Sequence, residues 1–148
     1  MKKLVLVAAL MVVVSAQAVE VGVNGGVDTA NADRTSYGVT VGQKFDKFGI
    51  TAGFDRVKSG NDLDKYTLVG SYDVTKFGTS TVAVKAGVAY LDNRQVGADG
   101  YAALVGAGVS IPVTAKLAAT VDYRYQVGQS RVSYLNGSAV TAGFKYSF

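Results

Sequence analysis

The chain of 148 residues contains no cysteine, no histidine and no tryptophan, and its single proline is Pro112. Without cysteine, no disulfide framework can form. Without histidine, neither a Ser-His-acid triad nor a His-Asp arrangement can be built, so Ser133 and Ser138 have no evident activating base. The sequence therefore predicts a protein that is not an enzyme, and no cofactor or metal is expected.

Long hydrophobic runs are also lacking, apart from one at the start of the chain. Lys2-Lys3 precedes an apolar run from Leu4 to Val14, which is followed by the small residues of Ser15-Ala16-Gln17-Ala18. This order is typical of a secretory signal peptide that is cleaved after Ala18. As a helix the run is too short to cross ~30 Å of hydrocarbon. We expect residues 1–18 to be a signal peptide and residues 19–148 to be one domain.

Neither sign of charge is in large excess, and the formal net charge is only +4. That excess is too weak to predict nucleic-acid binding. Two acidic pairs in predicted loops, Asp62 with Asp64 and Asp92 with Asp99, have the oxygen ligands of a divalent-cation site. We favour the simpler interpretation that these are solvated loop charges.

From Val19 onward, apolar residues alternate with polar or small ones, which is the period of a β-strand. Eight such runs are bounded by turn residues, each close to the ~9–11 residues that a tilted membrane-crossing strand requires. Short turns alternate with longer, more polar loops, as in outer-membrane barrels. An even number of strands then places both termini on the short-turn side. The predicted strands are residues 19–28, 35–45, 48–57, 65–74, 80–91, 100–111, 116–127 and 138–148.

The alternation defines two faces. The first carries valine, isoleucine, leucine and nearly all tyrosine and phenylalanine side chains, whereas the second carries glycine, small residues and charges. An eight-stranded interior is too narrow for so many bulky side chains, so the apolar face must point outward. Its aromatic residues gather near both strand ends, as at the two interfaces of a membrane. We therefore predict an all-β protein, an eight-stranded antiparallel up-and-down transmembrane β-barrel.

The C-terminal strand carries a further motif. Phe144, Tyr146 and Phe148 occupy alternate positions, and the chain ends on the last of them. This pattern resembles the terminal strand of Gram-negative outer-membrane proteins. The whole chain resembles their small eight-stranded barrels, namely the OmpA membrane domain and the OmpX/Ail and opacity-protein groups. The resemblance implies a place in the outer membrane among lipid and lipopolysaccharide, both termini in the periplasm, and recognition of Phe148, Tyr146 and Phe144 by the barrel-assembly machinery.

Basic and acidic side chains are nearly balanced on the inner face, so we expect them to pair, since a buried unpaired charge is costly. We predict a central cluster of Lys85, Asp122 and Arg124, and a pair of Glu20 with Lys145 where the first and last strands meet. The favoured role is a structural or surface protein with a charge-plugged lumen. The alternatives are a narrow or gated pore for small solutes and adhesion through the loops. The full set of predicted lumen charges is Lys44, Lys65, Lys85, Lys116, Arg124, Lys145, Glu20, Asp28, Asp55, Asp73 and Asp122.

Overall fold

The structure is a computed structural model that describes residues 19–29, 34–58, 62–93, 98–129, 133 and 136–148. The predicted signal peptide, residues 1–18, lies outside the described residues. No helix in the described ranges is long and apolar enough to cross a membrane. The strands are β1 (Val19–Asp28), β2 (Arg34–Phe45), β3 (Phe48–Lys58), β4 (Leu63–Phe77), β5 (Ser80–Asn93), β6 (Ala98–Pro112), β7 (Leu117–Gly128) and β8 (Gly137–Ser147).

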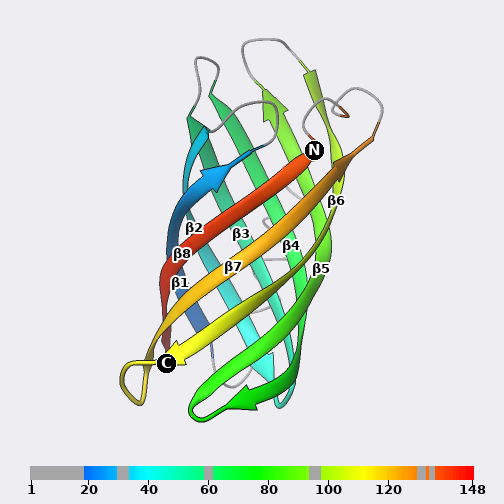
Figure 1. The fold of residues 1–148 in the computed structure, drawn as a ribbon. Coiled ribbons are helices and arrows are strands. Elements are labelled where there is room, and N and C mark those ends of the chain that lie inside the picture. Colours follow the sequence, from blue (N-terminus) through cyan, green and yellow to red (C-terminus); the bar gives the residue numbers. More distant parts are fainter. Residues whose placement is uncertain (1–18, 30–33, 59–61, 94–97, 130–132, 134–135) are drawn as a thin grey trace.

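These strands form one closed antiparallel barrel in which each strand pairs with its neighbours in sequence (Figure 1). The barrel closes because β1 also pairs with β8. At that seam the Phe148 N–H donates a 3.0 Å hydrogen bond to the Val19 carbonyl. Closure leaves no strand edge unpaired, which is the only way a sheet can cross a membrane. The predicted all-β, eight-stranded up-and-down architecture is confirmed.

Short and long connections alternate around the barrel. Two-residue turns join β2 to β3 at Asp46-Lys47 and β4 to β5 at Gly78-Thr79, and residues 113–116 join β6 to β7. Asp46 and Gly78 adopt left-handed φ angles of 53° and 59°, which aspartate tolerates and glycine adopts freely. These turns share one end of the barrel with Phe148, at the bottom of Figure 1. We call it the short-turn end, and the opposite end the loop end.

The strands β4, β5 and β6 are longer than predicted, and the loops are correspondingly shorter. The register of β4 against β5 shifts between Asp73 and Thr75, so Val74 forms a β-bulge. A bulge reverses the phase of the alternation. The period-two pattern therefore breaks at Val74, and the turn predicted over residues 75–79 is wrong because the strand continues to Phe77.

The face assignment holds along most of the barrel. Large apolar side chains stand exposed on the outer surface of every strand, among them Val39, Val88, Val105, Tyr123 and Phe144. One predicted lumen charge is misplaced, because Lys116 lies in the connection before β7 and is exposed.

Some glycines on the inner face lie where neighbouring strands approach too closely for a side chain. A Cβ atom on Gly106 would lie 2.1 Å from the Tyr123 carbonyl oxygen, and one on Gly143 would lie 2.1 Å from the Val23 carbonyl oxygen. Neighbouring backbones are thus too close for any side chain at these two positions. Glycine there allows the curvature on which the narrow lumen depends.

Candidate functional site

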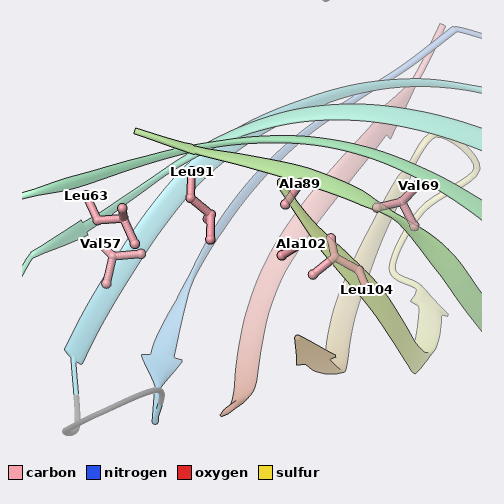
Figure 2. Packing of buried hydrophobic residues seen from close by; sticks show 7 residues of the cluster. All are labelled: Val57, Leu63, Val69, Ala89, Leu91, Ala102 and Leu104. Atoms are coloured by element: carbon pink, nitrogen blue, oxygen red, sulfur yellow. The ribbon is translucent and has the colours of Figure 1, made fainter. Parts of the chain in front are cut away.

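The lumen is the candidate site, and a cluster of buried apolar side chains, here called the plug, fills part of its loop half; Figure 2 shows their packing. All plug residues come from the inner faces of β3, β4, β5 and β6, which form one wall of the barrel. Leu91 is 0% exposed, and the others are also buried. The plug residues are Val57, Leu63, Val69, Ala89, Leu91, Ala102 and Leu104.

The alternation along the strands did not predict this plug, because it places only charged and small residues on the inner face. The signal was present as a local loss of alternation. Leu104 lies between Ala103 and Val105, and Leu91 follows Tyr90, so both positions extend apolar runs. Such runs are typical of strand segments that are buried on both faces. The prediction of a lumen plugged by charge is therefore incomplete, since leucine and valine fill its loop half.

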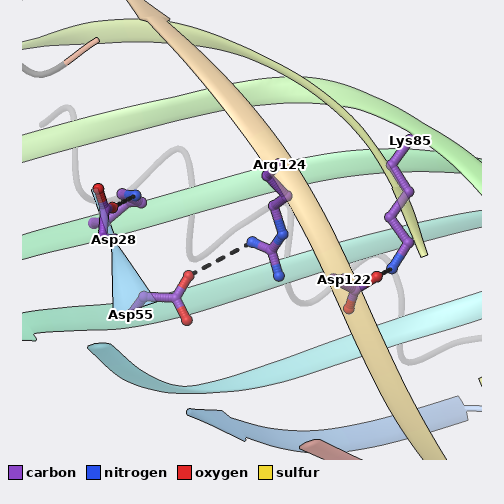
Figure 3. Close-up of polar contacts among 6 residues, drawn as sticks. Asp28, Asp55, Lys85, Asp122 and Arg124 are labelled. Atoms are coloured by element: carbon purple, nitrogen blue, oxygen red, sulfur yellow. Dashed lines mark hydrogen bonds and ion pairs between the residues drawn. The ribbon is translucent and has the colours of Figure 1, made fainter. Parts of the chain in front are cut away.

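Two ion pairs accompany the plug (Figure 3). Lys65 of β4 and Asp28 of β1 pair across the barrel at 3.0 Å between Nζ and Oδ2, and their side chains are only 9% and 7% exposed. Arg124 of β7 faces Asp55 of β3, with a longer separation of 3.8 Å between Nη1 and Oδ2. The Nε of Arg124 is buried and has no hydrogen-bond partner among the described residues.

Three further ion pairs lie between the middle of the lumen and the short-turn end. Lys85 pairs with Asp122, Lys44 Nζ lies 2.5 Å from Asp73 Oδ2, and Lys145 Nζ lies 3.2 Å from Glu20 Oε2. The exposed fraction of the lysine side chain falls along the barrel axis, from 34% at Lys44 and 28% at Lys145 to 24% at Lys85 and 9% at Lys65. Water therefore reaches the lumen from the short-turn end and is excluded toward the loop end.

The structure brings together most of the predicted lumen residues. Glu20 meets Lys145 at the seam, and Lys85 meets Asp122 midway along the barrel. Arg124 does not join the latter pair and is directed at Asp55 instead, as Figure 3 shows. Any role of the predicted pair and cluster beyond this geometry stays a prediction.

The predicted assembly residues lie along the outer face of the last strand. Phe144 and Tyr146 are exposed on β8, and the exposed Phe148 follows it. The rings of Tyr146 and Phe148 meet edge to face with centroids 5.0 Å apart. Their recognition by an assembly machinery stays a prediction.

A cavity of about 140 Å³ occupies the lumen between the short-turn end and the plug. Its wall includes all three ion pairs of that half, together with Arg124 and several hydroxyl side chains such as Ser71 and Thr120. A second chamber of about 20 Å³, with room for roughly one water molecule, lies beyond Arg124 beside Asp55 and Lys65. Arg124 lines both spaces and so marks the inner end of the cavity.

The outer surface of the loop end carries a continuous aromatic row. Phe54 and Tyr66 lie 5.2 Å apart between ring centroids, Tyr66 and Tyr90 lie 6.5 Å apart, and Tyr90 and Tyr101 lie 5.2 Å apart. This row, drawn from four successive strands, is the arrangement expected of a girdle at a membrane interface.

Three of the four acidic residues that we assigned to loops belong to strands, whereas Asp62 lies just before β4. Asp64 lies on β4 and accepts a 2.8 Å hydrogen bond from Arg56 Nε, while Asp99 on β6 accepts one of 2.5 Å from the Tyr90 hydroxyl. Asp92 lies on β5. Over the described ranges, no group of three or more acidic side chains is placed to hold a metal ion.

Comparison with known proteins identifies the fold. No family model and no curated protein matches the sequence. The N-terminal β-barrel domain of Pseudomonas aeruginosa OprF is similar in structure, with a TM-score of 0.76 and 18% identity over 89% of this chain and 98% of that one. Neisserial surface protein A gives a TM-score of 0.67 and 17% identity, covering 88% and 96% of the two chains. The Yersinia pestis outer membrane protein Ail gives 0.55 and 11%, covering 87% and 99%. The chain therefore has the fold of the eight-stranded outer-membrane barrels.

Proposed function

We propose that this protein is an integral barrel of the Gram-negative outer membrane whose closed lumen makes its role structural, or one performed at the cell surface. The closed lumen is the observation that carries the proposal. Leu91, Leu104, Leu63 and Val57 are buried inside the loop half, where a pore would need a continuous polar path. The ion pairs Lys65–Asp28 and Arg124–Asp55 occupy the polar part of the same half of the lumen.

The exposed apolar surface supports the membrane location. A monomeric soluble protein rarely exposes contiguous apolar patches larger than a few hundred Å². Here valine, tyrosine and phenylalanine side chains stand exposed on all eight strands, among them Val23, Val39, Tyr72, Val84 and Val121. Lipid, including lipopolysaccharide in the outer leaflet, is the partner that such a surface requires.

The proposed topology follows from the connections. Short turns face the periplasm in outer-membrane barrels and longer loops face outward. Val19 and Phe148 share the short-turn end, so both ends of the barrel domain would lie in the periplasm. Residues 1–18 would direct secretion and be removed, and the C-terminal Phe144, Tyr146 and Phe148 would be read by the barrel-assembly machinery. No catalytic function is proposed, since the chain contains no histidine to act as a base.

Membrane fractionation and bilayer recording test this proposal together. The native protein should appear in the outer-membrane fraction and migrate differently on gels before and after boiling. In planar bilayers it should show negligible conductance, whereas the double variant Leu91→Gly with Leu104→Gly should conduct more than the native protein, because these changes remove two of the three leucines of the plug. Regular conductance steps from the native protein would show that it is a pore and would contradict the structural role. Recovery in the soluble fraction would refute the membrane location.

A further inference from the structure

The cavity in the short-turn half of the lumen has an uneven charge distribution. Three acidic residues on its wall each pair with a lysine: Asp73 with Lys44, Asp122 with Lys85, and Glu20 with Lys145. The fourth cation on the wall is Arg124, and its carboxylate partner, Asp55, does not line the cavity. The wall therefore carries one positive charge more than negative charge, and that charge lies at the inner end.

The guanidinium of Arg124 is incompletely satisfied. Its Nη1 lies 3.8 Å from Asp55 Oδ2, whereas a charge-assisted N–H···O hydrogen bond is about 2.7–2.9 Å long. Its Nε is buried without a hydrogen-bond partner among the described residues. A buried donor without an acceptor is unfavourable, so this end of the cavity favours any small acceptor that can reach it.

Access and neighbouring donors are both present on the cavity wall. The cavity reaches toward the short-turn end, where Lys44 and Lys145 are partly exposed to solvent. Hydroxyl groups of Thr67 and Ser71 line the route, and Lys85 lies on the same wall as Arg124. The volume of about 140 Å³ admits a molecule of a few heavy atoms only.

We propose that the inner end of this cavity binds a small oxyanion, a phosphate or short carboxylate group, through the Arg124 guanidinium. The planar fork of arginine matches the oxygens of such groups, and Arg124 is a cation of the cavity lining whose carboxylate partner, Asp55, lies outside that lining. The ligand enters from the short-turn end, because the apolar plug closes the other side. This site depends on the lumen alone and holds whether or not the proposed membrane location is correct.

Nuclear magnetic resonance of the arginine Nε–H groups tests the site in the intact protein. The ¹⁵N-labelled barrel in detergent micelles is titrated with inorganic phosphate, and in a second series with acetate, while sodium chloride is reduced to keep ionic strength constant. Arg124 should show a saturable shift in at least one series. Arg34 is the internal control, because its Nε is also buried without a partner among the described residues but does not line the cavity. Arg56 on the outer face is the second control.

A variant provides an independent readout. Phosphate or acetate should raise the melting temperature of the native barrel, because a ligand that binds only the folded state stabilises it. Arg124→Lys keeps the charge but removes the planar fork. It should raise the half-saturating ligand concentration roughly tenfold, as expected for the loss of one charge-assisted hydrogen bond. A linear response at Arg124, equal shifts at all three arginines, or an unchanged response in Arg124→Lys would overturn the proposal. If the variant fails to fold, the native titration alone decides.

Discussion

Lys145 of β8 and Glu20 of β1 form an ion pair across the seam that closes the barrel, with 3.2 Å between Nζ and Oε2. The two residues are separated by nearly the whole barrel domain in sequence. They meet because both point inward near the short-turn end of adjacent strands, where Glu20 also lies opposite Ser147. The ion pair therefore forms only when β1 and β8 pair in the correct register.

Replacing Glu20 by glutamine should lower the free energy of unfolding by less than about 1 kcal/mol, because water reaches this end of the lumen and screens the pair. The charge reversal Glu20→Lys should cost more, since it places two cations together. Combining it with Lys145→Glu should recover most of the loss. Urea unfolding in detergent, followed by gel mobility, measures all four proteins. A double variant no more stable than Glu20→Lys would show that the pair does not contribute to closure.

Replacing Asp28 by asparagine should destabilise the barrel far more, by an amount on the order of 3–5 kcal/mol. The reason is burial, because Lys65 would keep its charge in a site that excludes water. Asp73→Asn is the matched control, since its partner Lys44 is 34% exposed and the loss should stay below about 1 kcal/mol. Equal losses in the two variants, measured by the same unfolding assay, would contradict the burial gradient along the lumen.

Replacing Asp122 by alanine separates a structural pair from a gate. Lys85 and Asp122 line the cavity, so water can solvate the remaining lysine, and the loss should be about 1–2 kcal/mol rather than the larger value of a dry site. Conductance in planar bilayers should remain negligible, because the plug lies on the loop side of this pair. Increased conductance would assign the pair a gating role. Unchanged stability with unchanged conductance would show that it has neither role.

Access to the lumen can be measured with single cysteines, because the chain has none of its own. Ser71→Cys on the cavity wall should react with a membrane-impermeant thiol reagent in permeabilised cells but not in intact ones. Thr35→Cys, at the exposed loop end of β2, should react in both. Ala102→Cys within the plug should react slowly throughout. Modification of Ser71→Cys in intact cells would mean that the lumen opens toward the cell surface.

Deleting Phe148 should impair assembly in cells more than folding in detergent. The ring is mostly exposed at the barrel rim, so its burial contributes only about 1–2 kcal/mol. The amount of barrel in the outer membrane should fall, while refolding into detergent from urea should change little. Phe77→Ala, another exposed ring at the short-turn end, is the control and should affect neither assay strongly. Equal impairment in both assays would assign Phe148 a role in stability alone.

Much of this architecture is determined by local sequence. Alternation along the chain predicts the eight strands and their outward faces, because successive side chains on a strand point to opposite sides. Short turns such as Asp46-Lys47 and the inward positions of Glu20 and Lys145 follow from the same period. An even strand number and the exclusion of free edges from a membrane are then enough to predict closure between β1 and β8.

Other features depend on how the strands are staggered and coiled around the lumen, which no single strand specifies. The stagger directs Arg124 to Asp55 and leaves Asp122 to Lys85, and it gathers Leu91 and Leu104 into a plug on one wall. The bulge at Val74 reverses the phase of the pattern that predicted its strand. Local sequence thus determined the number and faces of the strands. Contacts across the lumen were decided by the tertiary structure, because strand tilt and shear fix which distant residues lie at the same height along the barrel axis.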